Sequence, residues 1–208
     1  MDNTSDTSLP ELASAFTDLP IDSDSSKIGN VIKAMSRTTI ALDRFHRNKS
    51  SAPAFADIID ARNGAQHMLL SLSPQPDYMS TSEVTLYTVC RISLLIYSNM
   101  VIFPLPPVSG VSARLCTALK DSLGNETSSS AWRNAPKLII WALILGGISD
   151  GSDVERPWFI NKYVQLSSSL AINTWEQLKQ CLNSFLWLGF VLDQAAISFW
   201  AESQFSAH

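Results

Sequence analysis

Apolar residues recur with the period of an α-helix over the first part of the chain. On the first predicted helix they follow one another at steps of three, four and seven, which places them on one face. These residues are Ile28, Val31, Ile32, Met35, Leu42 and Phe45. A second helix is predicted to begin near Pro53 and to be weakened at Gly64. Its apolar residues are Phe55, Ile58, Ile59, Leu69 and Leu72.

Prolines and capping residues predict where the next helices begin and end. Ser80-x-x-Glu83 matches a capping box ahead of a long apolar segment, residues 84–103. That helix must end at residues 103–107, because proline disfavours helix both at its own position and at the residue before it. A short helix is expected over residues 115–123, followed by a loop over residues 127–130.

The remainder of the chain contains all six tryptophans and is typical of further apolar helices. One helix is predicted over residues 132–148 with Pro136 in its first turns, and another opens at Arg156-Pro157-Trp158. Thr174-x-x-Gln177 is a second capping box. It precedes a run at steps of three and four that predicts the core face of the last one or two helices: Trp175, Leu178, Leu182, Phe185, Gly189, Leu192, Ala196 and Phe199. No long run alternates with period two, so we predict an all-α fold, an irregular bundle of about seven to eight helices over residues 27–208.

Residues 1–26 differ from the rest, because they are acidic and serine-rich and contain no lysine or arginine. Pro10 and Pro20 interrupt any helix, and the composition predicts a disordered acidic tail. A second interpretation is an activation segment, whose acidic residues keep apolar side chains exposed for a partner. In that case Leu12 and Phe16, four residues apart, share one face of a helix induced in a partner's groove.

Composition and charge narrow the classes of function. The 208 residues are 46% apolar and 16% charged, with a formal net charge of -4, so we expect no sequence-specific DNA binding from this chain. Three cysteines, Cys90, Cys116 and Cys181, are an odd number and predict no disulfide framework. Residues 1–5 lack the features of a signal peptide, and the longest apolar run, residues 138–148, is shorter than the ~20 residues of a membrane span. We therefore expect a soluble, intracellular protein.

One motif suggests an enzyme. Gly147-Ile148-Ser149-Asp150-Gly151 matches the G-x-S-x-G of a nucleophile elbow, and the apolar run before it resembles a buried strand. An elbow needs a helix that begins at the serine and a later acid and histidine. The residues after Ser149 are typical of a turn, and the only later histidine is the terminal His208. A turn at a helix end is therefore the favoured interpretation, and a serine hydrolase that uses Ser149 is the weaker one.

The sequence indicates no metal or cofactor site. His46, His67 and His208 do not cluster with one another or with the cysteines, and no phosphate-binding glycine motif is present. We predict no catalytic, metal or cofactor-binding residues and no cofactor. The one basic cluster, residues 44–49, is interpreted as the favourable placement of cations at a helix C-terminus, with nucleic-acid contact or an import signal as the alternative.

Two ordered series of residues are more distinctive than any single motif. The first is CRISLLIYSN at residues 90–99, followed by FPLPP at residues 103–107. The second consists of KLIIW at residues 137–141, LGGI at 145–148, ERPWF at 155–159, WEQLK at 175–179, FLWL at 185–188, Asp193, and FWAE at 199–202. From roughly Ile28 to Glu202, this order and spacing resemble the fungal-specific transcription factor domain, the regulatory part of fungal binuclear zinc-cluster regulators.

The resemblance implies an all-helical, non-catalytic regulatory module of a nuclear protein that controls transcription, often of a metabolic gene set. It also implies action through protein partners, either the transcription machinery, a DNA-binding regulator or a second subunit in a homo- or hetero-dimer. Such regulators read DNA through a six-cysteine zinc cluster and a basic linker, and this chain contains neither. The resemblance therefore covers the C-terminal regulatory part, either of a truncated product or of a stand-alone relative. A helical domain that senses a small molecule in an apolar pocket is the alternative function.

Overall fold

The computed structural model describes residues 12–19, 27–47, 52–74, 81–124, 129–149 and 154–206. Over these ranges the chain is all-α, as predicted, without any strand. The described residues form nine α-helices: α1 (Lys27–His46), α2 (Phe55–Leu70), α3 (Thr81–Tyr97), α4 (Val111–Gly124), α5 (Ser129–Asn134), α6 (Pro136–Ile148), α7 (Arg156–Ser169), α8 (Trp175–Asn183) and α9 (Gly189–Ser206). A π-helical turn, Ser98–Ile102, continues α3, and Ser14–Phe16 and Pro107–Ser109 are short 3-10 turns.

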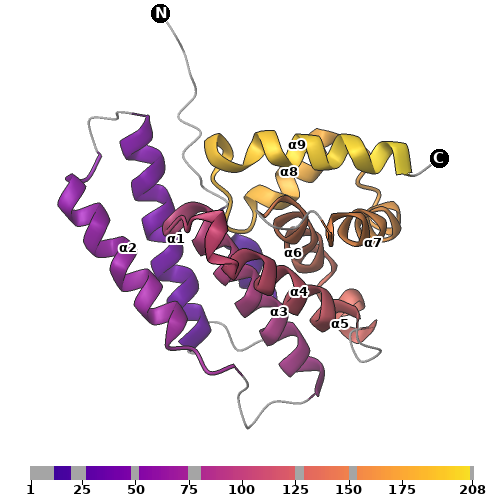
Figure 1. Cartoon of the computed structure of the whole chain (residues 1–208), viewed down its shortest axis with the longest axis horizontal. Helices are drawn as coiled ribbons and strands as arrows, with labels where there is room; N and C mark the ends of the chain where they lie inside the picture. Colours follow the sequence, from indigo (N-terminus) through magenta and orange to yellow (C-terminus); the bar gives the residue numbers. More distant parts are fainter. Residues whose placement is uncertain are drawn as a thin grey trace, which may run out of the picture.

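α6 lies at the centre of the fold because it is apolar on every side. Every residue from Leu138 to Ile148 is buried, and a helix that is hydrophobic all round needs its whole surface covered. The helices that cover it are α3, α4, α5, α7, α8 and α9. Figure 1 shows them around α6, with α1 and α2 packed as a hairpin at one side of the molecule.

The predicted faces of the first two helices are confirmed except at Phe45 and Phe55. These two side chains are 47% and 63% exposed, because they pack on each other where α1 ends and α2 begins and no other described helix covers them. Ile28, Val31, Ile32 and Met35 of α1 are buried, as are Ile58, Leu69 and Leu72 in and just after α2. α2 runs through Gly64 without interruption, and Gly64 faces open space, since a Cβ added there would meet no atom within 4 Å.

The long third helix ends where the prolines require it, because the π-helical turn stops at Ile102 and Phe103 leaves the helical conformation. Ser80 of the first predicted capping box lies outside the described residues. Among the described helices, the stretch Glu83–Ile102 alone is long and apolar enough to cross a membrane, and 72% of that stretch is buried inside the fold.

Several predicted boundaries are wrong in the middle of the chain. The helix predicted over residues 132–148 is divided, because Pro136 disfavours helix at Ala135, which has φ -141° and ψ 55°. α6 therefore begins at Pro136, where the missing N–H of proline is not needed. Ser129 and Ser130, predicted to lie in a loop, belong to α5, and α4 begins at Val111, four residues earlier than predicted.

The predicted end of the chain needs one refinement. The second capping box is confirmed: Thr174 Oγ1 accepts a hydrogen bond from the Gln177 N–H, and Gln177 Oε1 accepts one from the Thr174 N–H. The apolar run that follows belongs to two helices, because residues 184–188 connect α8 to α9.

Part of the predicted disordered tail packs on the helices. Phe16 is 2% exposed, and its ring stands edge-on to those of Trp141 and Phe185, with centroids 5.5 and 5.0 Å apart. The N–H groups of Ala13 and Ala15 donate to carbonyls of the α8–α9 connection at 3.2 and 3.0 Å. The prediction of an unpacked tail is therefore corrected for residues 12–19, because a buried aromatic ring and these hydrogen bonds offset the cost of ordering a short segment. Residues 1–11 and 20–26 lie outside the described residues.

The same packing removes the face proposed for an activation segment. Phe16 is buried, and Leu12 is half-buried against the core. These two side chains are not jointly presented to a partner.

Candidate interaction surface on the last helix

One face of α9 packs into the core. Leu192, Ala196, Phe199 and Ser203 recur at steps of three and four and are buried where α9 contacts α6 and α7. The helices approach closely because Gly147 has no side chain: a Cβ at that position would lie 2.1 Å from a ring carbon of Phe199. Close packing thus fixes the position of α9.

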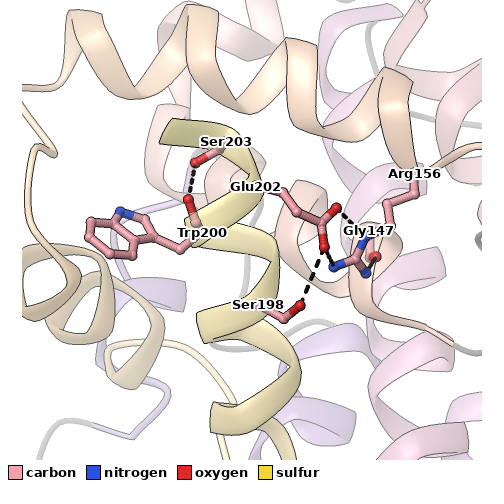
Figure 2. Close-up of polar contacts among 6 residues, drawn as sticks. All are labelled: Gly147, Arg156, Ser198, Trp200, Glu202 and Ser203. Carbon is pink, nitrogen blue, oxygen red and sulfur yellow. Dashed lines mark hydrogen bonds and ion pairs between the residues drawn. The ribbon is translucent and has the colours of Figure 1, made fainter. Parts of the chain in front are cut away.

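Arg156, in the first turn of α7, holds the C-terminal half of α9 (Figure 2). Its Nε and Nη2 donate to the two carboxylate oxygens of Glu202 at 3.0 and 2.8 Å, and its Nη1 donates to the Gly147 carbonyl at 2.6 Å. The guanidinium carbon also lies 5.6 Å from the centre of the Phe199 ring. A bidentate arginine–carboxylate pair fixes orientation as well as charge. One arginine therefore ties α6, α7 and α9 together.

The contact with Arg156 favours the ionised form of the Glu202 carboxylate. Hydrogen bonds from Arg156 lower the pKa of Glu202, and the partial burial of the carboxyl opposes that shift. The Arg156 charge and the Ser198 hydroxyl, 3.3 Å from Glu202 Oε1, also lower this pKa. The ionised pair is thus a structural anchor within the chain.

A second ion pair holds the beginning of α9. Lys179 Nζ of α8 pairs with Asp193 Oδ1, and the Trp187 indole N–H donates to the same oxygen at 2.8 Å. Asp193 and Glu202 are the only charged residues in the α9 sequence. Both charges of α9 are therefore compensated by cations of the same chain.

The opposite face of α9 is apolar and exposed. Phe190, Ile197 and Phe205 are 49%, 45% and 85% exposed. Together with the polar, exposed Gln194 and the half-buried Ala201 they form a line at steps of three and four, which we name the α9 stripe. A surface helix of a globular protein shows one apolar face, directed to the core. α9 carries two, and the second is open to solvent.

The exposed apolar surface continues from α9 towards α1 and α2. The rings of His46 and Phe190 are stacked, with centroids 3.7 Å apart. Phe45, next to His46, lies 6.0 Å from Phe55 between ring centroids, and both phenylalanines are exposed. The end of α1 and the beginning of α2 thus add aromatic surface beside the first turn of α9.

The basic cluster at the end of α1 has the helix-end placement that we favoured. Arg44 and His46 lie in the last turn of α1. Arg47 Nε donates to Asp43 Oδ1 at 2.8 Å. Lys49 lies outside the described residues.

Ser149 lacks the surroundings of a nucleophile elbow. The residues before it form α6 and not a strand, and Ser149 is 3% exposed. Its hydroxyl lies beside the buried Cys116 thiol: burial raises the pKa of that thiol, and the Ser149 hydroxyl opposes the shift. Asp150 and His208 lie outside the described residues. The geometry fits the turn at a helix end, because the backbone leaves the helical conformation at Ser149.

The cysteines and histidines do not form a reactive centre in the described ranges. Cys90, Cys116 and Cys181 are buried free thiols. Burial raises the pKa of Cys90 to about 12 and that of Cys181 to about 11, so both thiols are protonated at neutral pH. No group of three His, Cys, Asp or Glu side chains that would suit a metal occurs among the described residues.

Open hollows lie on either side of the docked N-terminal segment. One, of about 270 Å³, separates residues 12–17 from α1 at Ile32 and Arg37. The other, of about 490 Å³, lies between Leu19 and the beginning of α6. A third hollow, of about 540 Å³, lies between α7 and α9 and is lined by Ile160, Val164 and Phe205. The alternative function, sensing of a small molecule, would have to be sought in one of these hollows.

The inner apolar line of α9 was predicted from the sequence, and the outer one was missed. The signal was present, because residues 190, 194, 197, 201 and 205 repeat the same helical spacing on the other side. The Arg156–Glu202 pair carried no such signal, since its members are 46 residues apart.

No protein-family model, no curated protein and no solved structure matches this chain.

Proposed function

We propose that this protein is a non-catalytic helical interaction module of the transcription-regulator class, which acts by binding another protein through the α9 stripe. The observation that carries the proposal is the exposure of three large apolar side chains, Phe190, Ile197 and Phe205, along one face of a helix that two ion pairs hold in place. Contiguous exposed apolar surface of this kind marks contact sites on folded proteins.

The charges around the stripe favour a protein partner over a nucleic acid. The whole chain is acidic, and Asp193 and Glu202 of α9 are paired within the chain. The ring of His46, in the short basic cluster at the end of α1, stacks on Phe190, and Arg47 of that cluster is paired with Asp43. Nucleic-acid binding needs cations aimed at phosphates. An apolar protein surface suits a stripe made of phenylalanine and isoleucine.

The assignment to transcription is supported by the resemblance to the fungal regulatory domain. Two of the resembling segments, residues 155–159 and 199–202, contain Arg156 and Glu202. These segments are thus the ones whose contacts orient α9.

A reporter experiment tests the proposal. The full chain would be fused to a heterologous DNA-binding domain in a fungal reporter strain. The wild type would be compared with an Ile197→Lys/Phe205→Lys variant and with Val108→Lys, which changes a valine that is 96% exposed and lies away from α9 in sequence. We expect the wild type and Val108→Lys to change reporter output equally, and the stripe variant to return it to the level of the DNA-binding domain alone.

Circular dichroism of each purified chain controls for folding, since these substitutions replace exposed side chains. A wild-type fusion that leaves reporter output unchanged contradicts the proposal. A folded stripe variant that retains full output contradicts it equally.

A further inference from the structure

We propose that the partner of the α9 stripe is a second copy of this chain, whose own α9 lies antiparallel across the first. This inference rests on the proposed function, because it names the protein that the stripe binds.

The charge distribution of α9 suits contact with itself. In a two-fold dimer the same patch meets itself, so a patch with uncompensated charge of one sign repels its copy. Lys179 neutralises Asp193, and Arg156 neutralises Glu202, within one chain. Two copies of α9 therefore approach without like-charge repulsion, whereas a highly charged partner finds no free countercharge on this helix.

The order of side chains along the stripe also suits an antiparallel pair. Read in either direction, the stripe places phenylalanine at each end, isoleucine in the middle and a non-aromatic residue between. An antiparallel copy thus sets Phe190 of one chain near Phe205 of the other and brings the two Ile197 side chains together at the two-fold axis. At ~1.5 Å per residue the stripe is about 22 Å long, so both aromatic ends are engaged at once.

The area of the stripe predicts a reversible dimer. An aromatic side chain buries ~150–250 Å² when fully covered. With Phe190 49%, Ile197 45% and Phe205 85% exposed, the stripe offers about 300–450 Å² per copy. Twice that area is below the ~1,200 Å² of stable complexes and belongs to the weak class. We therefore expect dimerisation at micromolar or higher concentrations, strengthened if Phe45 and Phe55 join the contact.

Sedimentation equilibrium of the purified full chain tests the inference. We expect the mean mass to rise with concentration from 22.9 kDa towards twice that value. In Ile197→Lys two lysines would face each other at the axis, so we expect the dimerisation constant to weaken by more than tenfold. Val108→Lys should dimerise as the wild type does. A wild type that remains monomeric at every concentration, or an Ile197→Lys variant that dimerises equally well, overturns the inference.

Disulfide formation between introduced cysteines tests whether Ile197 lies at the two-fold axis of the dimer. The three native cysteines are buried, so the thiol introduced by Ile197→Cys is readily oxidised by glutathione disulfide. We expect a covalent dimer from Ile197→Cys much faster than from the Val108→Cys control at equal concentration. Equal rates would show random collision and overturn the antiparallel arrangement. Failure here differs from failure of the proposed function, because a monomeric chain whose reporter output still depends on the stripe binds a different protein.

Discussion

Replacing Gly147 by alanine adds one methyl group to α6 at the point where α9 crosses it. The added Cβ would lie 2.1 Å from one carbon of the Phe199 ring and 2.6 Å from another, whereas carbon atoms in contact stay ~3.5–4.0 Å apart. The Phe199 ring has little room to move, because it is fully buried, stands against the ring of Tyr163 and lies under the guanidinium of Arg156. We therefore expect α9 to shift and the Arg156–Glu202 contact to loosen.

The magnitude follows from two opposing effects. Forcing a methyl group into a packed core costs about 1–3 kcal/mol. Alanine is favoured over glycine inside a helix by up to ~1 kcal/mol, but Gly147 is the penultimate residue of α6, where this gain is smaller. The net expectation is a loss of about 1–3 kcal/mol of folding free energy. For a chain of this size the melting temperature should fall by about 2–12 °C.

Gly64 in α2 provides the matched control. It is also a helical glycine, but a Cβ there meets no atom within 4 Å, so Gly64→Ala should stabilise the chain by up to ~1 kcal/mol. Urea unfolding followed by far-UV circular dichroism would measure both variants, which we expect to shift the midpoint in opposite directions. A Gly147→Ala midpoint at or above that of the wild type would refute the close contact of α6 with α9.

Three further predictions concern other contacts. Because Arg156 lowers the pKa of Glu202 in the folded chain, the pair stabilises the fold above the unfolded pKa of ~4.3 and is lost as pH falls through the folded value; the stability gap between wild type and Glu202→Gln should be present at neutral pH and should narrow as the pH falls through the lowered pKa of Glu202 in the folded chain, and a gap that does not change with pH would disprove this. Trp187 is fully buried and Trp175 only half-buried, so Trp187→Ala should cost about 3–5 kcal/mol and Trp175→Ala clearly less; equal urea midpoints would be inconsistent with their placement. Phe16→Ala should lower the free energy of unfolding by about 3 kcal/mol, the lower end of the range for buried Phe→Ala substitutions, because the open hollows beside residues 12–19 allow this segment to relax. An unchanged urea midpoint would mean that residues 12–19 are not docked.

The helical faces could be predicted because each is recorded in local spacing. Ile28 to Met35 alternate with polar residues at helical steps, and those residues are buried on α1. The apolar run of residues 138–148 predicted an apolar helix, and every one of those residues is buried in α6. The Thr174 capping box also depends only on neighbours, and both of its hydrogen bonds are formed. Local rules therefore recovered most of the helices.

The break at Ala135 was within reach of the same rules. Pro136 was predicted to lie inside the first turns of a helix, although proline acts most strongly against helix at the residue before it. If Ala135 is taken as non-helical for this reason, one helix must end at Asn134 and the next must begin at Pro136. The structure has these two boundaries.

The contacts that position the candidate surface are not local. Arg156 and Glu202 meet because α7 and α9 both pack on α6. Their separation of 46 residues in the sequence does not predict this contact. Phe16 is buried because Trp141 and Phe185, far along the chain, leave a place for its ring. Such contacts depend on the tertiary arrangement and cannot be read from the composition of a short segment. For this reason the composition of residues 1–26 predicted a disordered tail, although residues 12–19 pack on the helices.

Site-specific photo-crosslinking in living cells tests the central claim, that α9 contacts another protein through its outer face. A photoreactive phenylalanine analogue would replace Phe205, which is aromatic and largely exposed, and in a control chain would replace Val108. We expect an ultraviolet-dependent adduct of defined mass from position 205, absent from position 108 and lost when Ile197→Lys is added. No adduct at position 205, or the same adducts from both positions, would contradict the account.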